Sequence, residues 1–185
     1  MSKPILIIIS GPPSTGKTTL AKAIAEKFTI PLITKDNLKE ILFDTIGWKD
    51  RSWSQRLGIA SFAILHYILD SFMSTSQSLI IEGNFKSEFE SVEIKTRLKK
   101  FNYSAVQIMC QSDGKILFKR FKKRSESGQR HPGHCDTGNY HELKPDLLKG
   151  KYNPLDIDSS VIIFDSTNLN HLDYQSIFDQ LSSLL

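Results

Sequence analysis

The stretch GPPSTGKT, residues 11–18, carries residue types at a spacing that suits phosphate chemistry. It matches the pattern G-x-x-x-x-G-K-[ST] in full, in which glycines let the backbone turn tightly and approach phosphate oxygens. Lys17 would reach the β- and γ-phosphates of a nucleoside triphosphate, and the hydroxyl of Thr18 suits Mg²⁺ as a hard oxygen ligand. We therefore predict a triphosphate cradle that is formed by Gly11, Pro12, Pro13, Ser14, Thr15, Gly16, Lys17, Thr18 and Thr19.

A second candidate is the carboxylate Asp36 in LITKDNLKEILFD, residues 32–44, where a short strand gives way to a helix. A side chain at the carboxyl end of a parallel strand faces the crevice in which open α/β sheets bind ligands. Asp36 could accept the proton of an acceptor hydroxyl during phosphoryl transfer, and we expect Asn37 to lie beside the same acceptor. The alternative is that Asp36 only caps its helix.

The stretch LIIEGNF, residues 79–85, ends another apolar run with a single acidic residue. Glu82 lies near the place where an acidic residue would hold magnesium through water. Glu82, Asn84 and Phe85 could instead border an acceptor pocket. A plain alternative is that Glu82 is a solvated acid at the edge of the sheet.

Basic residues are concentrated between residues 115 and 130. Arg120 and Arg124 are four apart on a predicted helix, so they share a face and could point at one anion. The guanidinium fork suits phosphate, and we expect Arg130 to contact the nucleotide as well. The lysines of this run, by contrast, are typical of a solvated helix face. The basic residues are Lys115, Lys119, Arg120, Lys122, Lys123, Arg124 and Arg130.

The segment SESGQRHPGHCDTGNY, residues 125–140, has no apolar periodicity, and loops of this length are usually functional lids or disordered. We predict a lid at about residues 125–141, with His131 and His134 near phosphate or acceptor. These histidines and Cys135 could bind zinc, but no matching ligand pair occurs elsewhere. At the end of the last apolar run, Asn168 is expected to hold the adenine edge.

Apolar runs alternate with helix-like stretches, which indicates a parallel sheet covered on both faces. Each predicted strand is continuously apolar, as expected for burial on both faces. The strands are predicted at residues 4–10, 32–34, 78–82, 105–110 and 160–165. Helices are predicted at residues 18–28, 36–43, 54–73 with Ser54 as the cap, 88–101, 113–123 with Asp113 as the cap, and 171–185.

The chain has 185 residues, of which 39% are hydrophobic and 24% charged, and this composition fits one globular domain over residues 1–185. A net charge of +4 is mild and suits an acidic partner such as a nucleotide. Cys110 and Cys135 show no zinc or disulfide spacing, so we expect a reducing, cytoplasmic setting. The run ILIII at residues 5–9 is too short to span a membrane. We expect no membrane association and a monomer or weak dimer.

The cradle, TKDNLKEIL, IIEGNF and LFKRFKKRSESGQRHPGH together resemble the small phosphate-loop kinases, including chloramphenicol phosphotransferase, zeta toxin and the kinase part of polynucleotide kinase. Generic relatives are called AAA family ATPases. The resemblance implies a three-layer αβα fold with a five-stranded parallel sheet in the order 2-3-1-4-5. It also implies that Asp36 matches the catalytic aspartate and that lid arginines clamp the donor phosphates.

These observations favour a kinase that uses ATP and Mg²⁺ to phosphorylate a hydroxyl of a small molecule, with Lys17, Asp36, Arg120 and Arg124 as catalytic residues. One alternative, which we do not favour, is a polynucleotide 5′-hydroxyl kinase, whose acceptor would be a nucleic acid. It would need aromatic platforms, which Trp48, Trp53 and Tyr67, with Lys49 and Arg51, could supply in part. Another is a nucleotide-hydrolysing switch without an acceptor, although the sequence holds no N-K-x-D guanine reader.

Overall fold

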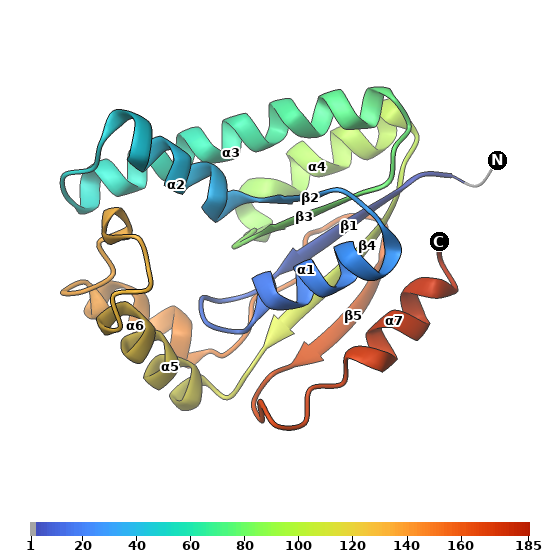
Figure 1. The fold of residues 1–185 in the computed structure, drawn as a ribbon. Coiled ribbons are helices and arrows are strands. Elements are labelled where there is room, and N and C mark those ends of the chain that lie inside the picture. Colours follow the sequence, from blue (N-terminus) through green and yellow to red (C-terminus); the bar gives the residue numbers. More distant parts are fainter. Residues whose placement is uncertain (1–2) are drawn as a thin grey trace.

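The computed structural model describes residues 3–185 as a central sheet with helices on both faces (Figure 1). All neighbouring strands pair in parallel. Their order is β2-β3-β1-β4-β5, which confirms the predicted fold class and strand order. The strands are β1 (Ile5–Ser10), β2 (Leu32–Thr34), β3 (Leu79–Gly83), β4 (Ser104–Gln111) and β5 (Ser160–Asp165).

Four helices form the outer layers, and α2, α5 and α6 lie toward the carboxyl ends of the strands (Figure 1). Helices α1 and α7 pack on one face of the sheet, and α3 and α4 pack on the other. Helices α2 and α5 directly follow the ends of β2 and β4. The helices are α1 (Lys17–Phe28), α2 (Lys35–Ile46), α3 (Arg51–Ser74), α4 (Ser87–Phe101), α5 (Gly114–Glu126), α6 (Tyr140–Leu148) and α7 (Tyr174–Ser182), with a short 3₁₀ turn, η1 (Pro132–His134).

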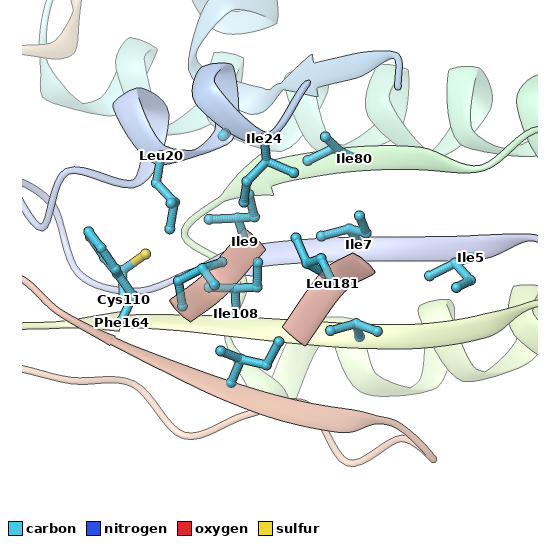
Figure 2. Packing of buried hydrophobic residues seen from close by; sticks show 14 residues of the cluster. Ile5, Ile7, Ile9, Leu20, Ile24, Ile80, Ile108, Cys110, Phe164 and Leu181 are labelled. Atoms are coloured by element: carbon cyan, nitrogen blue, oxygen red, sulfur yellow. The ribbon is translucent and has the colours of Figure 1, made fainter. Parts of the chain in front are cut away.

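The apolar run of β1 is continuous because its side chains enter two cores in alternation. Ile5, Ile7 and Ile9 face the layer of α1 and α7 (Figure 2). Leu6 and Ile8 face the layer of α3 and α4. All five are buried, so β1 fixes the position at which the cradle leaves the sheet.

Strand β5 corrects the expectation that every strand is buried on both faces. Ile162 and Phe164 pack into the core beneath α7, whereas Val161 is 45% and Ile163 53% exposed. The reason is that β5 is an edge strand whose second face has little cover. Its central run VIIF is continuously apolar, so the sequence pattern could not reveal this exposure.

Several helix boundaries also differ from the sequence predictions. Helix α3 begins at Arg51 because Asp50 caps it, with its carboxylate accepting a hydrogen bond from the Trp53 amide at 2.8 Å. The predicted cap, Ser54, instead lies buried inside the helix. Asp113 does cap α5, as predicted. The last helix is shorter than predicted and covers Tyr174–Ser182.

The predicted lid is more regular than its composition suggests. It contains the end of α5, the turn η1 and the start of α6. Helix α6 was missed because Pro145 lies inside it and its apolar positions are few. Leu147 packs there against Leu117 and Phe121 of α5, so tertiary contacts support a helix that the local sequence only weakly favours.

Within residues 3–185, α3 is the one helix long and apolar enough to cross a membrane by length and composition. Leu57, Leu65, Leu69 and Met73 of this helix are buried within the protein. A core helix meets the same criterion, so this finding is weak evidence for a membrane span.

Candidate active site

The cradle connects β1 to α1, and its backbone conformation explains both glycines. Gly11 has φ +147°, and a Cβ atom there would overlap the carbonyl oxygen of Cys110. Gly16 takes the left-handed conformation with φ +84° at the start of α1. The Thr15 hydroxyl donates to the Pro12 carbonyl at 2.9 Å and closes the loop. The chain thus turns sharply and aims the amino end of α1 at the space above the sheet, where anions are stabilised.

Lys17 projects into this space from the first turn of α1. Its ammonium donates to the Pro12 carbonyl at 2.9 Å. Burial lowers the pKa of Lys17, and the nearby Glu82 carboxylate only partly opposes this. A buried cation that is held by a single carbonyl is suited to an incoming anion.

Thr18 and Glu82 bring two oxygen ligands together, as the magnesium prediction requires. The Thr18 hydroxyl donates to Glu82 Oε2 at 3.2 Å. Glu82 is only 4% exposed, so it is not the solvated edge acid of the alternative reading. Burial raises the pKa of Glu82, against the opposing effect of Lys17. Oxygen ligands of this kind, completed by phosphate and water, are those that Mg²⁺ takes in nucleotide sites.

Three buried side-chain polar atoms among residues 3–185 lack a hydrogen-bond partner, and all three belong to elements that border this edge of the sheet. They are Ser14 Oγ in the cradle, Thr34 Oγ1 at the end of β2, and Arg124 Nε on α5. Buried polar groups are nearly always paired in folded proteins. Donors left free beside Lys17 fit a nucleotide phosphate, which would accept hydrogen bonds from Ser14 and Arg124.

Asp36 lies in the first turn of α2 and is held by two cations. Its Oδ1 atom accepts from Lys35 Nζ at 3.3 Å, and its Oδ2 atom accepts from both terminal nitrogens of Arg130 at 3.2 Å. Burial would raise the pKa of Asp36, but Lys35 and Arg130 together hold this pKa far below its usual range. These bonds go to side chains and not to the free amides of α2, so helix capping does not account for Asp36.

Arg130 is the centre of a hydrogen-bond network in the lid. Its Nε atom donates to Asp136 Oδ2 at 2.6 Å, and an Nη atom donates to His134 Nδ1 at 3.0 Å. On the other side of the ring, His134 Nε2 lies 2.8 Å from Glu40 Oε1. Because an ionised carboxylate only accepts, this arrangement assigns His134 as the neutral form with its proton on Nε2. Burial lowers the pKa of His134, in agreement with that form.

The lid is bound along one face of α2 at successive helical turns. Asp36, Glu40 and Asp44 are spaced four residues apart, so their side chains share that face. Asp36 pairs with Arg130, Glu40 with His134, and Asp44 with His131, whose Nε2 atom is 3.1 Å from Asp44 Oδ1. Gly133 lies close to the ring of Phe43 on the same helix, where any larger side chain would overlap it.

These pairs change the expected role of the lid histidines. His134 is buried and both of its ring nitrogens are engaged, and the ring of His131 stacks on Phe43. In this structure they bind α2 and leave no ring nitrogen of His134 for an acceptor. Among residues 3–185 there is no cluster of metal-binding side chains that would support the zinc alternative.

The two helix arginines do not converge as expected. Arg120 donates to the carbonyl oxygens of Ser166 at 2.7 Å and Thr167 at 2.9 Å, so it ties α5 to the segment after β5. Arg124 is different, because its guanidinium is largely buried and its Nε atom is free. Burial lowers the pKa of Arg124, and Arg130 lowers it further. Only Arg124 of the two thus remains available to an anion at the cradle in this arrangement.

The other predicted contact residues are less uniform. Phe85 is 0% exposed and packs in the core with Phe62, so its side chain does not line a pocket as expected. Asn84 is half-buried, and Asn37 is exposed. Asn168 is exposed beyond β5, where its side chain accepts a hydrogen bond from the Asn170 amide.

Two buried lysines, Lys35 and Lys39, were not singled out from the sequence. They lie four residues apart on α2 and flank Asp36. The available signal was the spacing of basic and acidic residues in KDNLKE, which places both lysines on one helix face. That pattern is also typical of a solvated helix, so their burial could not be inferred from it.

A cavity of about 560 Å³ lies on the lid, and Arg130 and Asp136 border it together with His131 and Trp48. Arg130 thus borders this cavity and also contacts Asp36.

The sheet order and the cradle define a fold of the P-loop class. Residues 7–141 match the family described as AAA domain. The chain belongs to this AAA domain family, and its fold is that of the small P-loop kinases.

Solved structures agree with this assignment. A candidate kinase from Chloroflexus aurantiacus is 33% identical, with a TM-score of 0.92 and 100% of each chain covered. A shikimate kinase from Bacteroides thetaiotaomicron is 19% identical, with a TM-score of 0.53 and 97% of each chain covered. A gluconokinase from Sinorhizobium meliloti is 15% identical, with a TM-score of 0.52 and 98% of each chain covered. The last two show a likeness of fold alone. No curated protein matched the chain.

Proposed function

We propose that this protein transfers the γ-phosphoryl group of ATP to a hydroxyl of a small molecule, with the aid of Mg²⁺. The observation that supports this best is the contact between Asp36 and Arg130 at the edge of the sheet that carries the cradle. Arg130, a lid residue that is suited to the donor phosphates, contacts Asp36, the candidate proton acceptor. A group for the donor and a group for the acceptor therefore lie next to each other. Two proteins of the same fold, the shikimate kinase and the gluconokinase, are named as small-molecule kinases.

On the donor side, the residues of the chain bind and neutralise phosphate charge. Lys17 and the free Nε of Arg124 stabilise the negative charge that the transferring group carries. The Ser14 hydroxyl and the amides at the start of α1 position the phosphates. Thr18 and Glu82 would hold Mg²⁺, which would supply further neutralisation of phosphate charge.

On the acceptor side, Asp36 orients the hydroxyl and takes its proton as the new O–P bond forms and the bond to the leaving ADP oxygen breaks. In the present arrangement the low pKa of Asp36 makes it a weak base, because Lys35 and Arg130 stabilise the carboxylate. Transfer of Arg130 from Asp36 to the donor phosphates would raise this pKa. The lid would thereby activate the base only when the nucleotide is in place.

The polynucleotide alternative receives little support from the aromatic residues. The Trp53 indole donates to the Gly47 carbonyl at 2.9 Å, and Arg51 forms an ion pair with Glu142 at 2.8 Å. Both side chains are therefore committed to structural contacts. Trp48 and Tyr67 are exposed, but no further observation connects them into a base-stacking platform.

A screen with ATP labelled in the γ-phosphoryl group tests the proposal. Wild-type protein would be incubated with pooled small hydroxylated metabolites, single-stranded oligonucleotides, or no acceptor, with Lys17→Met as a matched inactive control. We expect label to appear in a small molecule and to depend on Lys17. Label in oligonucleotides would support the polynucleotide alternative. Release of labelled phosphate at a rate that is the same with and without every acceptor would support the nucleotide-hydrolysing switch.

A further inference from the structure

Lys39 is a buried cation that the phosphate chemistry does not use. It is 6% exposed, and its ammonium donates to Ser54 Oγ at 2.9 Å and lies 5.2 Å from the centre of the Phe43 ring. Burial lowers the pKa of Lys39 to about 8, and the ammonium of Lys35 lowers it as well. A buried ammonium normally pairs with an anion because desolvation is costly.

No carboxylate of residues 3–185 forms an ion pair with Lys39, since the nearby acids have other partners. Asp36 is held by Lys35 and Arg130. The remaining nearby pairs are Asp136 with Arg130, Glu40 with His134, and Glu142 with Arg51. The direct contacts of the Lys39 ammonium are thus a hydroxyl and an aromatic face, and the Asp36 carboxylate acts on it without forming an ion pair.

Lys39 is placed beside the candidate proton acceptor. It lies three residues after Asp36 on α2, so the two side chains share a helix face and are separated by about one turn, with Cβ atoms roughly 5–6 Å apart. Lys35, which contacts Asp36 directly, lies four residues before Lys39 and shares the helix face of Lys39. A molecule with its hydroxyl at Asp36 would therefore present its next few atoms to Lys39.

A glycine leaves space next to the ammonium. Gly58 lies in the interior of α3, where a Cβ atom would be 3.8 Å from both Cε and Nζ of Lys39 and would meet nothing else within 4 Å. Glycine weakens a helix interior compared with alanine, so a glycine at such a position usually has a packing or functional reason. Here its effect is that no side chain of residue 58 lies against the Lys39 ammonium.

We propose that the acceptor is a small hydroxylated anion whose carboxylate or phosphate group is bound by Lys39 while its hydroxyl lies at Asp36. This inference rests on the proposed kinase function and assigns Lys39 as the residue that selects the acceptor by charge. Both anionic groups accept the charge-assisted hydrogen bonds that an ammonium donates. Lys35 adds a second positive charge to the same subsite.

Acceptors that resemble one another in shape but differ in charge test this inference. Polyols of increasing length, their aldonic acids and their phosphate monoesters would be offered with labelled ATP to the full-length protein. We expect the aldonic acids or the phosphate monoesters to be phosphorylated and the neutral polyols to be phosphorylated only weakly. The series that is phosphorylated identifies whether the subsite binds a carboxylate or a phosphate. Equal use of neutral and anionic members of each pair would overturn the inference.

Variants test whether Lys39 is responsible. With the anionic acceptor, Lys39→Met should raise the acceptor KM by about 10- to 100-fold, the value of a charge-assisted hydrogen bond. The KM for ATP should stay unchanged, Lys39→Arg should restore part of the acceptor affinity, and the exposed Lys95→Met control should behave as wild type. Gly58→Ala should also raise the acceptor KM. Unaltered acceptor KM values in both Lys39→Met and Gly58→Ala would contradict the role.

A binding measurement keeps this inference separate from the kinase proposal. Thermal shifts of wild type and Lys39→Met would be measured with the same polyols, aldonic acids and phosphate monoesters in the presence of ADP and Mg²⁺. Anion-selective shifts that vanish in Lys39→Met, without phosphorylation of any compound, would refute the kinase function and leave the anion subsite standing. The absence of any anion-selective shift would refute the subsite itself.

Discussion

Both terminal nitrogens of Arg130 donate to one oxygen of Asp36, Oδ2, at 3.2 Å. The contact joins the lid to the first turn of α2, across a long separation in sequence. It places a cation that is suited to phosphate on the residue expected to receive a proton. The lid and the acceptor base are therefore electrostatically coupled before any substrate is bound.

Replacing Arg130 should expose that coupling. In Arg130→Gln the pKa of Asp36 should rise, because Arg130 is, after Lys35, the strongest of the charges that lower it. Titration of the Asp36 carboxyl carbon by NMR should show a higher midpoint, and phosphoryl transfer should fall by about 100-fold through loss of a charge-stabilising donor. Arg97→Gln is the matched control, since Arg97 pairs with Asp70 on the outer helices. An unchanged Asp36 midpoint would contradict the coupling.

His134 should make stability depend on pH in mildly acidic solution. Its pKa is lowered from 6.5 in the folded protein by burial, so below pH 6.5 the unfolded chain binds more protons than the folded one. Stability should therefore rise as pH increases toward 6.5 and gain nothing more from this group above it. Thermal melts should show this slope in wild type and in the exposed His141→Gln control. His134→Gln should reduce the slope, and an equal slope in all three proteins would contradict the assignment.

Lys39 should contribute a second pH dependence at alkaline pH. Its pKa is lowered from 10.5 to about 8 on folding, so the unfolded chain binds more protons between these values and stability should increase as pH rises through this window. At pH 7, the free energy of unfolding of Lys39→Met should exceed that of wild type by about 1 to 3 kcal/mol, and the upper value follows from the size of the pKa shift. Denaturant melts at pH 7 and pH 10 measure both effects, and a less stable Lys39→Met protein at pH 7 would contradict them.

Two glycine-to-alanine changes should have opposite effects. Gly11→Ala should destabilise the fold by about 2 kcal/mol or more and abolish nucleotide binding, because the added Cβ would overlap the Cys110 carbonyl. Gly58→Ala should instead stabilise α3 by up to about 1 kcal/mol, since its Cβ finds only ordinary contacts with Lys39. Thermal melts and nucleotide titration distinguish the two variants. A stable, nucleotide-binding Gly11→Ala protein would contradict the geometry of the cradle.

The features predicted well from the sequence are those set by local pattern. The cradle follows from a contiguous motif after a buried strand, and the strand order was implied by the family resemblance and is confirmed. Arg120 shows where local pattern fails. Helical spacing places it on the face of Arg124, but its direction is decided by carbonyls of Ser166 and Thr167, which come from a distant segment.

Burial was the other property that the sequence could not supply. The side chains of Phe85 and Lys39 are both buried, although one follows a strand end and the other lies in a charged helical stretch. Their environments depend on how α2, α3 and the lid pack together. The pairing of Asp36, Glu40 and Asp44 with the lid likewise requires the tertiary structure, even though their four-residue spacing is visible in the sequence.

The most direct test of the central claim is the rate of acceptor-dependent phosphoryl transfer in Asp36→Asn, measured alongside nucleotide affinity. Asparagine keeps the size of the side chain and removes its capacity to take a proton. We predict a rate lower by about 100-fold or more, with ATP binding retained because the cradle residues are untouched. A variant that phosphorylates the acceptor at the wild-type rate would show that Asp36 is not the base and would contradict the proposed mechanism.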